Sequence, residues 1–199
     1  NSSPKILKVL SDTSVIISEG EVLELNNDKN LTINEDVYLE VIHGKTASLF
    51  SAACQVGGMS AETSNEKIEA LRSFGTNFGI SFQLIDDAKD YSSTTNKIGK
   101  NIGDDFKEGK VTLPLIIAYL RSNSQEKKFW KRTIQNLKQD KNDFNKALDI
   151  INKYNCINDT IERAIHFANI AKDSLGIFKD TIYKQVLINL IDSSISRVH

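Results

Sequence analysis

Apolar residues recur three and four positions apart along almost the whole chain, which is the spacing of one face of an α-helix. From Pro4 to about Leu25, residues such as Ile6, Val9 and Leu10 follow this spacing. No segment shows the alternation of apolar and polar residues that is typical of a strand, and no internal repeat is present. The pattern predicts an all-α protein, an antiparallel helical bundle, with residues 1–199 forming a single domain.

The same spacing predicts further helices, at residues 32–56, 64–91, 125–138, 143–154, 158–174 and 179–196. Gly57 and Gly58 are expected to end the first of these. Gly75 and Gly79 lie four residues apart in the next helix, so they either permit close contact with a neighbouring helix or merely tolerate crowding. Residues 92–110 are polar and rich in glycine, and loops of this length are usually functional or disordered.

Composition excludes several classes of protein. The 25 Lys and Arg residues nearly balance 26 Asp and Glu residues, and 40% of the chain is hydrophobic, as in ordinary globular proteins. A disordered tail, a disulfide scaffold and a generic nucleic-acid binder are therefore disfavoured, and no apolar run is long enough to span a membrane. Cys54 and Cys156 have no metal-type spacing and are expected to be free thiols, which fits a cytoplasmic protein. The three histidines share no ligand spacing either.

Three carboxylates form the main candidate site. Asp86, Asp87 and Asp90 lie in FQLIDDAKDY, residues 82–91, and their spacing places them on one side of a helix. Like charges repel there, and the C-terminal end of a helix disfavours anions. A divalent cation such as Mg²⁺ would compensate both effects, because it takes oxygen ligands from carboxylates and phosphates. The alternative is a solvated acidic helix end, and Gln83, on the same face, favours the metal site.

Lysines gather around this acidic segment. Lys97, Lys100, Lys107 and Lys110 lie in the loop that follows it, and Lys45 precedes Thr46 within an earlier helix. One interpretation is that these cations form salt bridges, and a lysine within a helix commonly extends its ammonium group to solvent. A metal with several lysines is also what binding of a diphosphate requires.

Four segments together carry a family resemblance. They are SEGEVLEL (residues 18–25), KTA (45–47), FQLIDDAKDY (82–91) and GKNIGDDFKEGKVTLPL (99–115). The chain resembles the trans-isoprenyl diphosphate synthases, and most of all the bacterial octaprenyl type. The resemblance implies an all-α isoprenoid synthase fold around an apolar cavity, a homodimer, and Mg²⁺-dependent addition of isopentenyl diphosphate to an allylic diphosphate. The product would be a long-chain polyprenyl diphosphate, the precursor of an isoprenoid quinone side chain.

The resemblance also implies a role for each matching residue. Asp86 would bind Mg²⁺, and Asp87 and Asp90 would hold the metal directly or through water. The allylic diphosphate would contact Lys45, Thr46, Gln83, Lys100 and Lys110, with Lys45 and Lys100 catalytic because they stabilise the departing pyrophosphate. The dimer would form through residues 4–25 and 32–56.

Several features depart from the family pattern. The family has two aspartate-rich motifs, and these 199 residues contain only the second. We therefore expect the chain to correspond to the C-terminal two-thirds of a synthase, with the N-terminal helices missing, and to be inactive alone. Glu24 stands where relatives often have Gln. The alternatives are a non-catalytic subunit that regulates a partner synthase, and a structural bundle with an incidental acidic cluster.

Overall fold

The computed structural model describes residues 3–92 and 103–198, and every regular element in these two ranges is a helix. The long helices are α1 (Pro4–Asn26), α3 (Ser48–Ser60), α4 (Asn65–Asp90), α9 (Cys156–Ser174) and α10 (Ile182–Ile195). The shorter elements are α2 (Glu35–Ile42), η1 (His43–Ala47), α5 (Asp104–Glu108), α6 (Leu113–Arg121), α7 (Ser124–Trp130), η2 (Lys131–Gln135), α8 (Asp143–Lys153), η3 (Leu175–Ile177) and η4 (Ser196–Val198). The predicted all-α class is confirmed.

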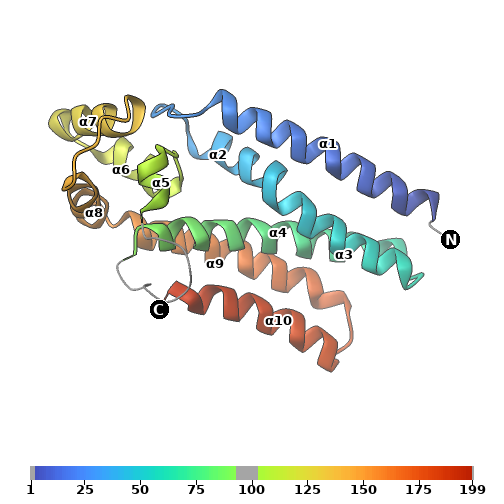
Figure 1. The fold of residues 1–199 in the computed structure, drawn as a ribbon. Helices are drawn as coiled ribbons and strands as arrows, with labels where there is room; N and C mark the ends of the chain where they lie inside the picture. The colour runs from blue at the N-terminus through green and yellow to red at the C-terminus, as the bar shows by residue number, and fades with distance from the viewer. Residues whose placement is uncertain (1–2, 93–102, 199) are drawn as a thin grey trace.

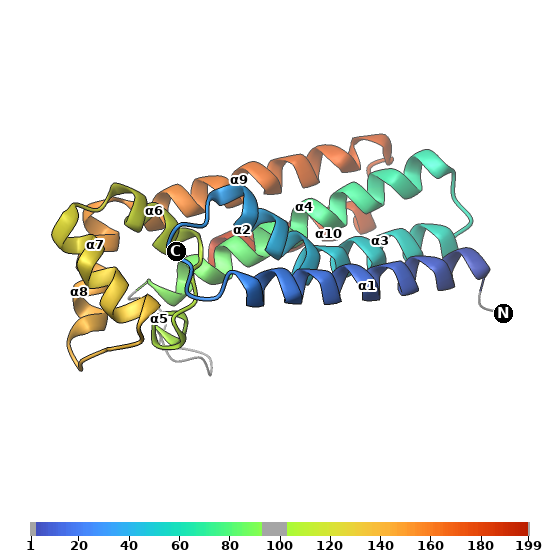
Figure 2. The same ribbon diagram turned by 90° about the horizontal axis from the view of Figure 1, so that it is seen from above.

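The long helices lie side by side and alternate in direction. Helix α4 packs against α3 on one side and against α9 on the other, and α1 and α10 form the outer layers (Figure 1). The short helices α5 to α8 gather at one end, beside the C-terminal end of α1 (Figures 1 and 2). Leu84 and Ile85 of α4 are completely buried and anchor the core beneath this end of the bundle. No helix in the described ranges is both long enough and apolar enough to cross a membrane.

Glycines permit the closest helix contacts. A Cβ atom on Gly75 would lie 2.5 Å from the Phe50 carbonyl oxygen, and one on Gly79 would lie 2.7 Å from the Ala47 Cα atom. These two positions therefore serve close approach of α4 to α3 and η1, the first of the two readings open from the sequence. A Cβ atom on Gly20 would likewise lie 2.7 Å from the Lys45 backbone nitrogen. Helix α1 thus lies directly against η1.

The helix predicted over residues 32–56 differs from the structure at both ends. The helix expected over residues 32–56 begins at Glu35, where the Asn34 side chain accepts a hydrogen bond from the Val37 amide. It also continues through Gly57 and Gly58 to Ser60 as α3. Gly58 is buried against α4, where a Cβ atom would lie 2.8 Å from the Leu71 side chain. Packing, and not helix termination, explains that glycine.

The same stretch contains a π-helical turn that the periodicity did not reveal. Residues His43–Ala47 form η1 between α2 and α3, and the turn carries Lys45 and Thr46. Single π-helical turns widen a helix locally and are frequent at functional sites. Cys54 is a half-buried free thiol and Cys156 a buried one, as predicted.

Candidate functional site

A cavity of about 390 Å³ opens at the end of the bundle where α1, α2, η1, α4, α5 and the segment after α5 meet. Six of the eight residues predicted to bind metal or diphosphate line it, namely Lys45, Thr46, Gln83, Asp86, Asp87 and Lys110. Asp90 lies outside the lining. Lys100 and the neighbouring Lys97 lie outside the described residues. The fold therefore brings together side chains from three separate segments.

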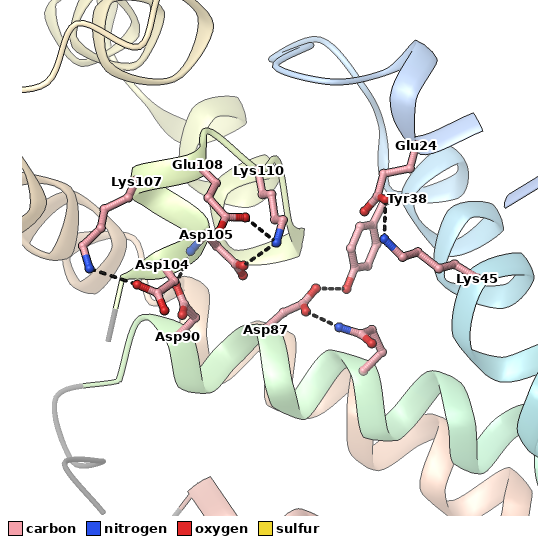
Figure 3. Close-up of polar contacts among 11 residues, drawn as sticks. Glu24, Tyr38, Lys45, Asp87, Asp90, Asp104, Asp105, Lys107, Glu108 and Lys110 are labelled. Carbon is pink, nitrogen blue, oxygen red and sulfur yellow. Dashed lines mark hydrogen bonds and ion pairs between the residues drawn. The ribbon is translucent and has the colours of Figure 1, made fainter. Parts of the chain in front are cut away.

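Asp87 is a buried carboxylate of the cavity, with 4% of its surface exposed. The Tyr38 hydroxyl donates a hydrogen bond of 2.5 Å to one carboxyl oxygen, and the Gln83 amide donates one of 2.7 Å to the other. The Thr46 hydroxyl donates a bond of 3.1 Å to the Gln83 carbonyl oxygen. Figure 3 shows Asp87 pointing from α4 toward Tyr38 of α2. Thr46, Gln83 and Asp87 thus form a hydrogen-bonded chain from η1 to α4.

Burial is the main cause of the shifted pKa values of Asp87 and Tyr38. It raises the pKa of Asp87 to about 7, and the nearby charges of Asp105 and Asp86 act in the same direction. The hydrogen bonds from Tyr38 and Gln83 oppose this shift. Burial, followed by the charge of Asp87, raises the pKa of Tyr38 well above its ordinary value. Asp87 is therefore poised to hold or release a proton near neutral pH.

Both described lysines of the cavity are paired with glutamates. Lys45 Nζ lies 2.5 Å from Glu24 Oε2 on α1 and 3.5 Å from Glu21 Oε2. Lys110 Nζ lies 2.7 Å from Glu108 Oε2 and 3.9 Å from Asp105 Oδ1. In Figure 3 the two groups face each other across the cavity, with Asp87 below and between them. Charged pairs at these positions place ammonium groups at both sides of the opening.

Asp90 holds residues 103–108 in place through two hydrogen bonds. Its side chain accepts a hydrogen bond of 3.0 Å from the Asp105 amide, and its backbone carbonyl accepts one of 3.0 Å from the Gly103 amide. Gly103 adopts a positive φ of 83°, a conformation that glycine takes readily. These contacts hold α5, with Glu108 at its end, beside the C-terminal end of α4.

The carboxylates fit a cation that arrives together with phosphate oxygens. Within residues 3–92 and 103–198, no three His, Cys, Asp or Glu residues are arranged to hold a metal ion by themselves. Asp86 and Asp87 nevertheless both line the cavity. Mg²⁺ is commonly held by one or two carboxylates, with substrate phosphates and water completing its coordination. The donor set therefore suits a metal shared with a diphosphate, not a closed protein cage.

The sequence did not predict four of the site residues or their roles. Tyr38 gave no signal, because its partner Asp87 lies 49 positions away. Glu24 stood out only as a departure from the family pattern, and its contact with Lys45 depends on how α1 packs on η1. The sequence indicated only that Asp105 and Glu108 belong to a polar loop. Their alternation with Lys107 and Lys110 was the one available hint of local ion pairs.

Comparisons with known proteins identify relatives over nearly the whole chain. Residues 1–151 match the family described as polyprenyl synthetase. Octaprenyl diphosphate synthase of Haemophilus influenzae is 37% identical over 98% of this chain, and that of Escherichia coli is 35% identical over 98%. The chain spans 59% and 60% of the length of these two proteins.

Solved structures show the same fold. A decaprenyl diphosphate synthase from Rhodobacter capsulatus superimposes with a TM-score of 0.93 and 38% identity, over 99% of this chain and 61% of that protein. A polyprenyl synthase from Caulobacter crescentus, complexed with calcium and isoprenyl diphosphate, gives a TM-score of 0.94 and 43% identity over 99% and 60%. The helices described above are thus arranged as in these enzymes.

Proposed function

The chain belongs to the polyprenyl synthetase family, and from this premise we propose that it acts in the synthesis of a long-chain polyprenyl diphosphate. The reaction would add isopentenyl diphosphate units to an allylic diphosphate, with an octaprenyl-type product. The supporting observation is the convergence of Lys45, Thr46, Gln83, Asp86, Asp87 and Lys110 on one cavity. We propose that this cavity binds the diphosphate group of the allylic substrate.

Each side chain has a task in this proposal. Asp86, supported by Asp87 and Asp90, would hold Mg²⁺, which when bound supplies a Lewis acid that neutralises the departing diphosphate. Lys45 and Lys110 approach the cavity from opposite sides and would donate charge-assisted hydrogen bonds to the diphosphate oxygens. Lys100 is proposed to act with them. Thr46 and Gln83 would orient these groups through the hydrogen-bonded chain to Asp87.

The chain spans about 60% of its relatives, and its sequence holds one aspartate-rich motif. We therefore propose that these 199 residues bind the allylic diphosphate but do not elongate it without the remaining groups of the site. Chain elongation from farnesyl and isopentenyl diphosphate with Mg²⁺, measured by product chromatography on this chain alone, would contradict this part of the proposal. We also propose a homodimer through residues 4–25 and 32–56.

Binding of inorganic pyrophosphate and of farnesyl diphosphate, measured by calorimetry with and without Mg²⁺, tests the proposed site. Asp86→Ala is expected to weaken Mg²⁺-dependent binding by at least about tenfold, because it removes a charged ligand. Asp149→Ala, an exposed carboxylate on α8 far from the cavity, is the matched control and is expected to bind normally. Equal binding by both variants, or no Mg²⁺-dependent binding by the unmodified chain, would reject the proposal.

A further inference from the structure

The cavity is more acidic than a diphosphate site requires. Among the described residues that line it, the two lysines are Lys45 and Lys110. Six carboxylates line it as well, namely Glu24, Asp28, Asp86, Asp87, Asp105 and Glu108. A bare diphosphate that enters this cavity meets lysines already paired with glutamates and further negative charge around them.

Glu24 makes the shortest ion pair with a lysine of the cavity. Its Oε2 atom lies 2.5 Å from Lys45 Nζ, and both side chains remain more than a third exposed. The contact of Gly20 with η1 fixes α1 in place, so that Glu24, one helical turn later, stays beside Lys45. Glu21 is 1.0 Å farther from the same ammonium group, half exposed, and outside the cavity lining. The position of Glu24 is therefore built into the packing of α1 on η1.

We propose that Glu24 competes with the diphosphate for Lys45 and thereby increases the dependence of diphosphate binding on a divalent cation. The inference rests on the proposed function only in naming the ligand. Glu24 is a specificity-determining residue in this view. It disfavours the free diphosphate and tolerates the metal-loaded one.

The preference for the metal complex over the free diphosphate follows from Coulomb's law. The repulsion between Glu24 and a ligand grows in proportion to the ligand's negative charge. A free pyrophosphate carries several negative charges near neutral pH, whereas its metal complex carries fewer. Glu24 therefore weakens the binding of the free anion more than it weakens the binding of the metal complex. Because the carboxylate is partly exposed, it can turn toward solvent when the complex arrives, leaving Lys45 to the diphosphate oxygens.

The decisive experiment measures pyrophosphate affinity by calorimetry, in the presence of a chelator and then in excess Mg²⁺. Glu24→Gln keeps the size and hydrogen-bonding ability of the side chain and removes its charge. We expect this variant to bind cation-free pyrophosphate about tenfold more tightly than the unmodified chain. Its affinity for the Mg²⁺ complex is expected to change less than about threefold. Circular dichroism checks that each variant is folded.

Matched variants separate a specific effect from a general loss of negative charge. Glu21→Gln is expected to give a smaller gain than Glu24→Gln, and Glu19→Gln, on the same helix outside the cavity, no gain. In a Lys45→Gln background the gain from Glu24→Gln is expected to become smaller, because the part that comes from competition for Lys45 is lost.

The outcomes distinguish this inference from the proposed function. Cation-free binding that is unchanged or weaker in Glu24→Gln, or a gain of undiminished size in the Lys45→Gln background, would overturn the role of Glu24. Loss of all Mg²⁺-dependent binding would instead reject the proposed site, and the comparison under chelator would still decide the role of Glu24.

Discussion

At the scale of single residues, three aspartates on one side of a helix turn out to have three different surroundings. Asp86 lines the cavity, Asp87 is buried against Tyr38, and Asp90 binds the amide of Asp105. Helical spacing predicted their direction around α4, because it depends only on the sequence of that helix. It could not predict what packs against each one, since Tyr38 and Asp105 reach α4 from other parts of the chain.

Burial of Asp87 predicts a pH-dependent stability. Its pKa in the folded chain is about 7, against 3.8 as the ordinary value. The folded state therefore binds this proton more tightly than the unfolded state, so the contribution of Asp87 to stability is greatest below about pH 4 and is lost as pH rises toward 7. Asp87→Asn removes this titration. Relative to the unmodified chain, the variant should gain about 1–3 kcal/mol in free energy of unfolding between pH 4 and pH 8.

Urea denaturation at a series of pH values measures this difference. Asn145→Ala, a change of an exposed and uncharged residue on α8, is the control. Because it removes no ionisable group, its pH profile should follow that of the unmodified chain. A profile of Asp87→Asn that runs parallel to the unmodified one over the whole range would show that Asp87 remains ionised in the fold.

At the scale of elements, the sequence predicted most helices correctly but misjudged what glycines do. The spacing of Gly75 and Gly79 allowed a close helix contact, and the structure has one. Gly57 and Gly58 predicted a helix end, yet α3 passes through both. A glycine pair has the same local conformational freedom in either role, so only the neighbouring helix decides between them. The π-helical turn η1 was also missed by the sequence analysis.

Gly75 and Gly57 offer a direct test of this distinction. Both lie within helices, but a Cβ atom on Gly75 would lie 2.5 Å from a backbone oxygen, whereas one on Gly57 meets nothing within 4 Å. Gly75→Ala should therefore lower the free energy of unfolding by about 1–3 kcal/mol, because backbone must move to accept the methyl group. Gly57→Ala should raise it by about 0.5–1 kcal/mol, the usual helix preference for alanine. Chemical denaturation measures both, and a stabilising Gly75→Ala would contradict the packing described here.

At the scale of the whole molecule, the family motifs predicted that distant segments would share a cavity, and six of the eight predicted residues do. The motifs carry that information because each segment matches a different part of the family's sequence, in the same order along the chain. They could not predict Glu24 as the partner of Lys45, since that ion pair depends on how α1 packs against η1. The balance of charge in the site is therefore a property of this fold and not of its motifs.

Helix α1 forms an outer layer with two buried residues, Thr13 and Gly20. Its exposed apolar residues include Leu7, Leu10, Val15 and Val22. A groove of about 810 Å³ runs between α1 and the start of η1, with Glu40 and His43 on its far side. A helix that exposes this much apolar surface is suited to burial against another molecule. This surface supports the proposed homodimer through residues 4–25 and 32–56.

Replacing Val15 by Glu tests the dimer at the centre of that surface. Val15 is 55% exposed, so the substitution should leave the fold intact while placing a charge in the interface. Sedimentation analysis should show a dimer for the unmodified chain and an association at least about tenfold weaker for Val15→Glu. Val186→Glu on α10 is the matched control, because Val186 is 51% exposed on the opposite outer layer. A monomeric unmodified chain, or equal weakening by both variants, would show that α1 is not the interface.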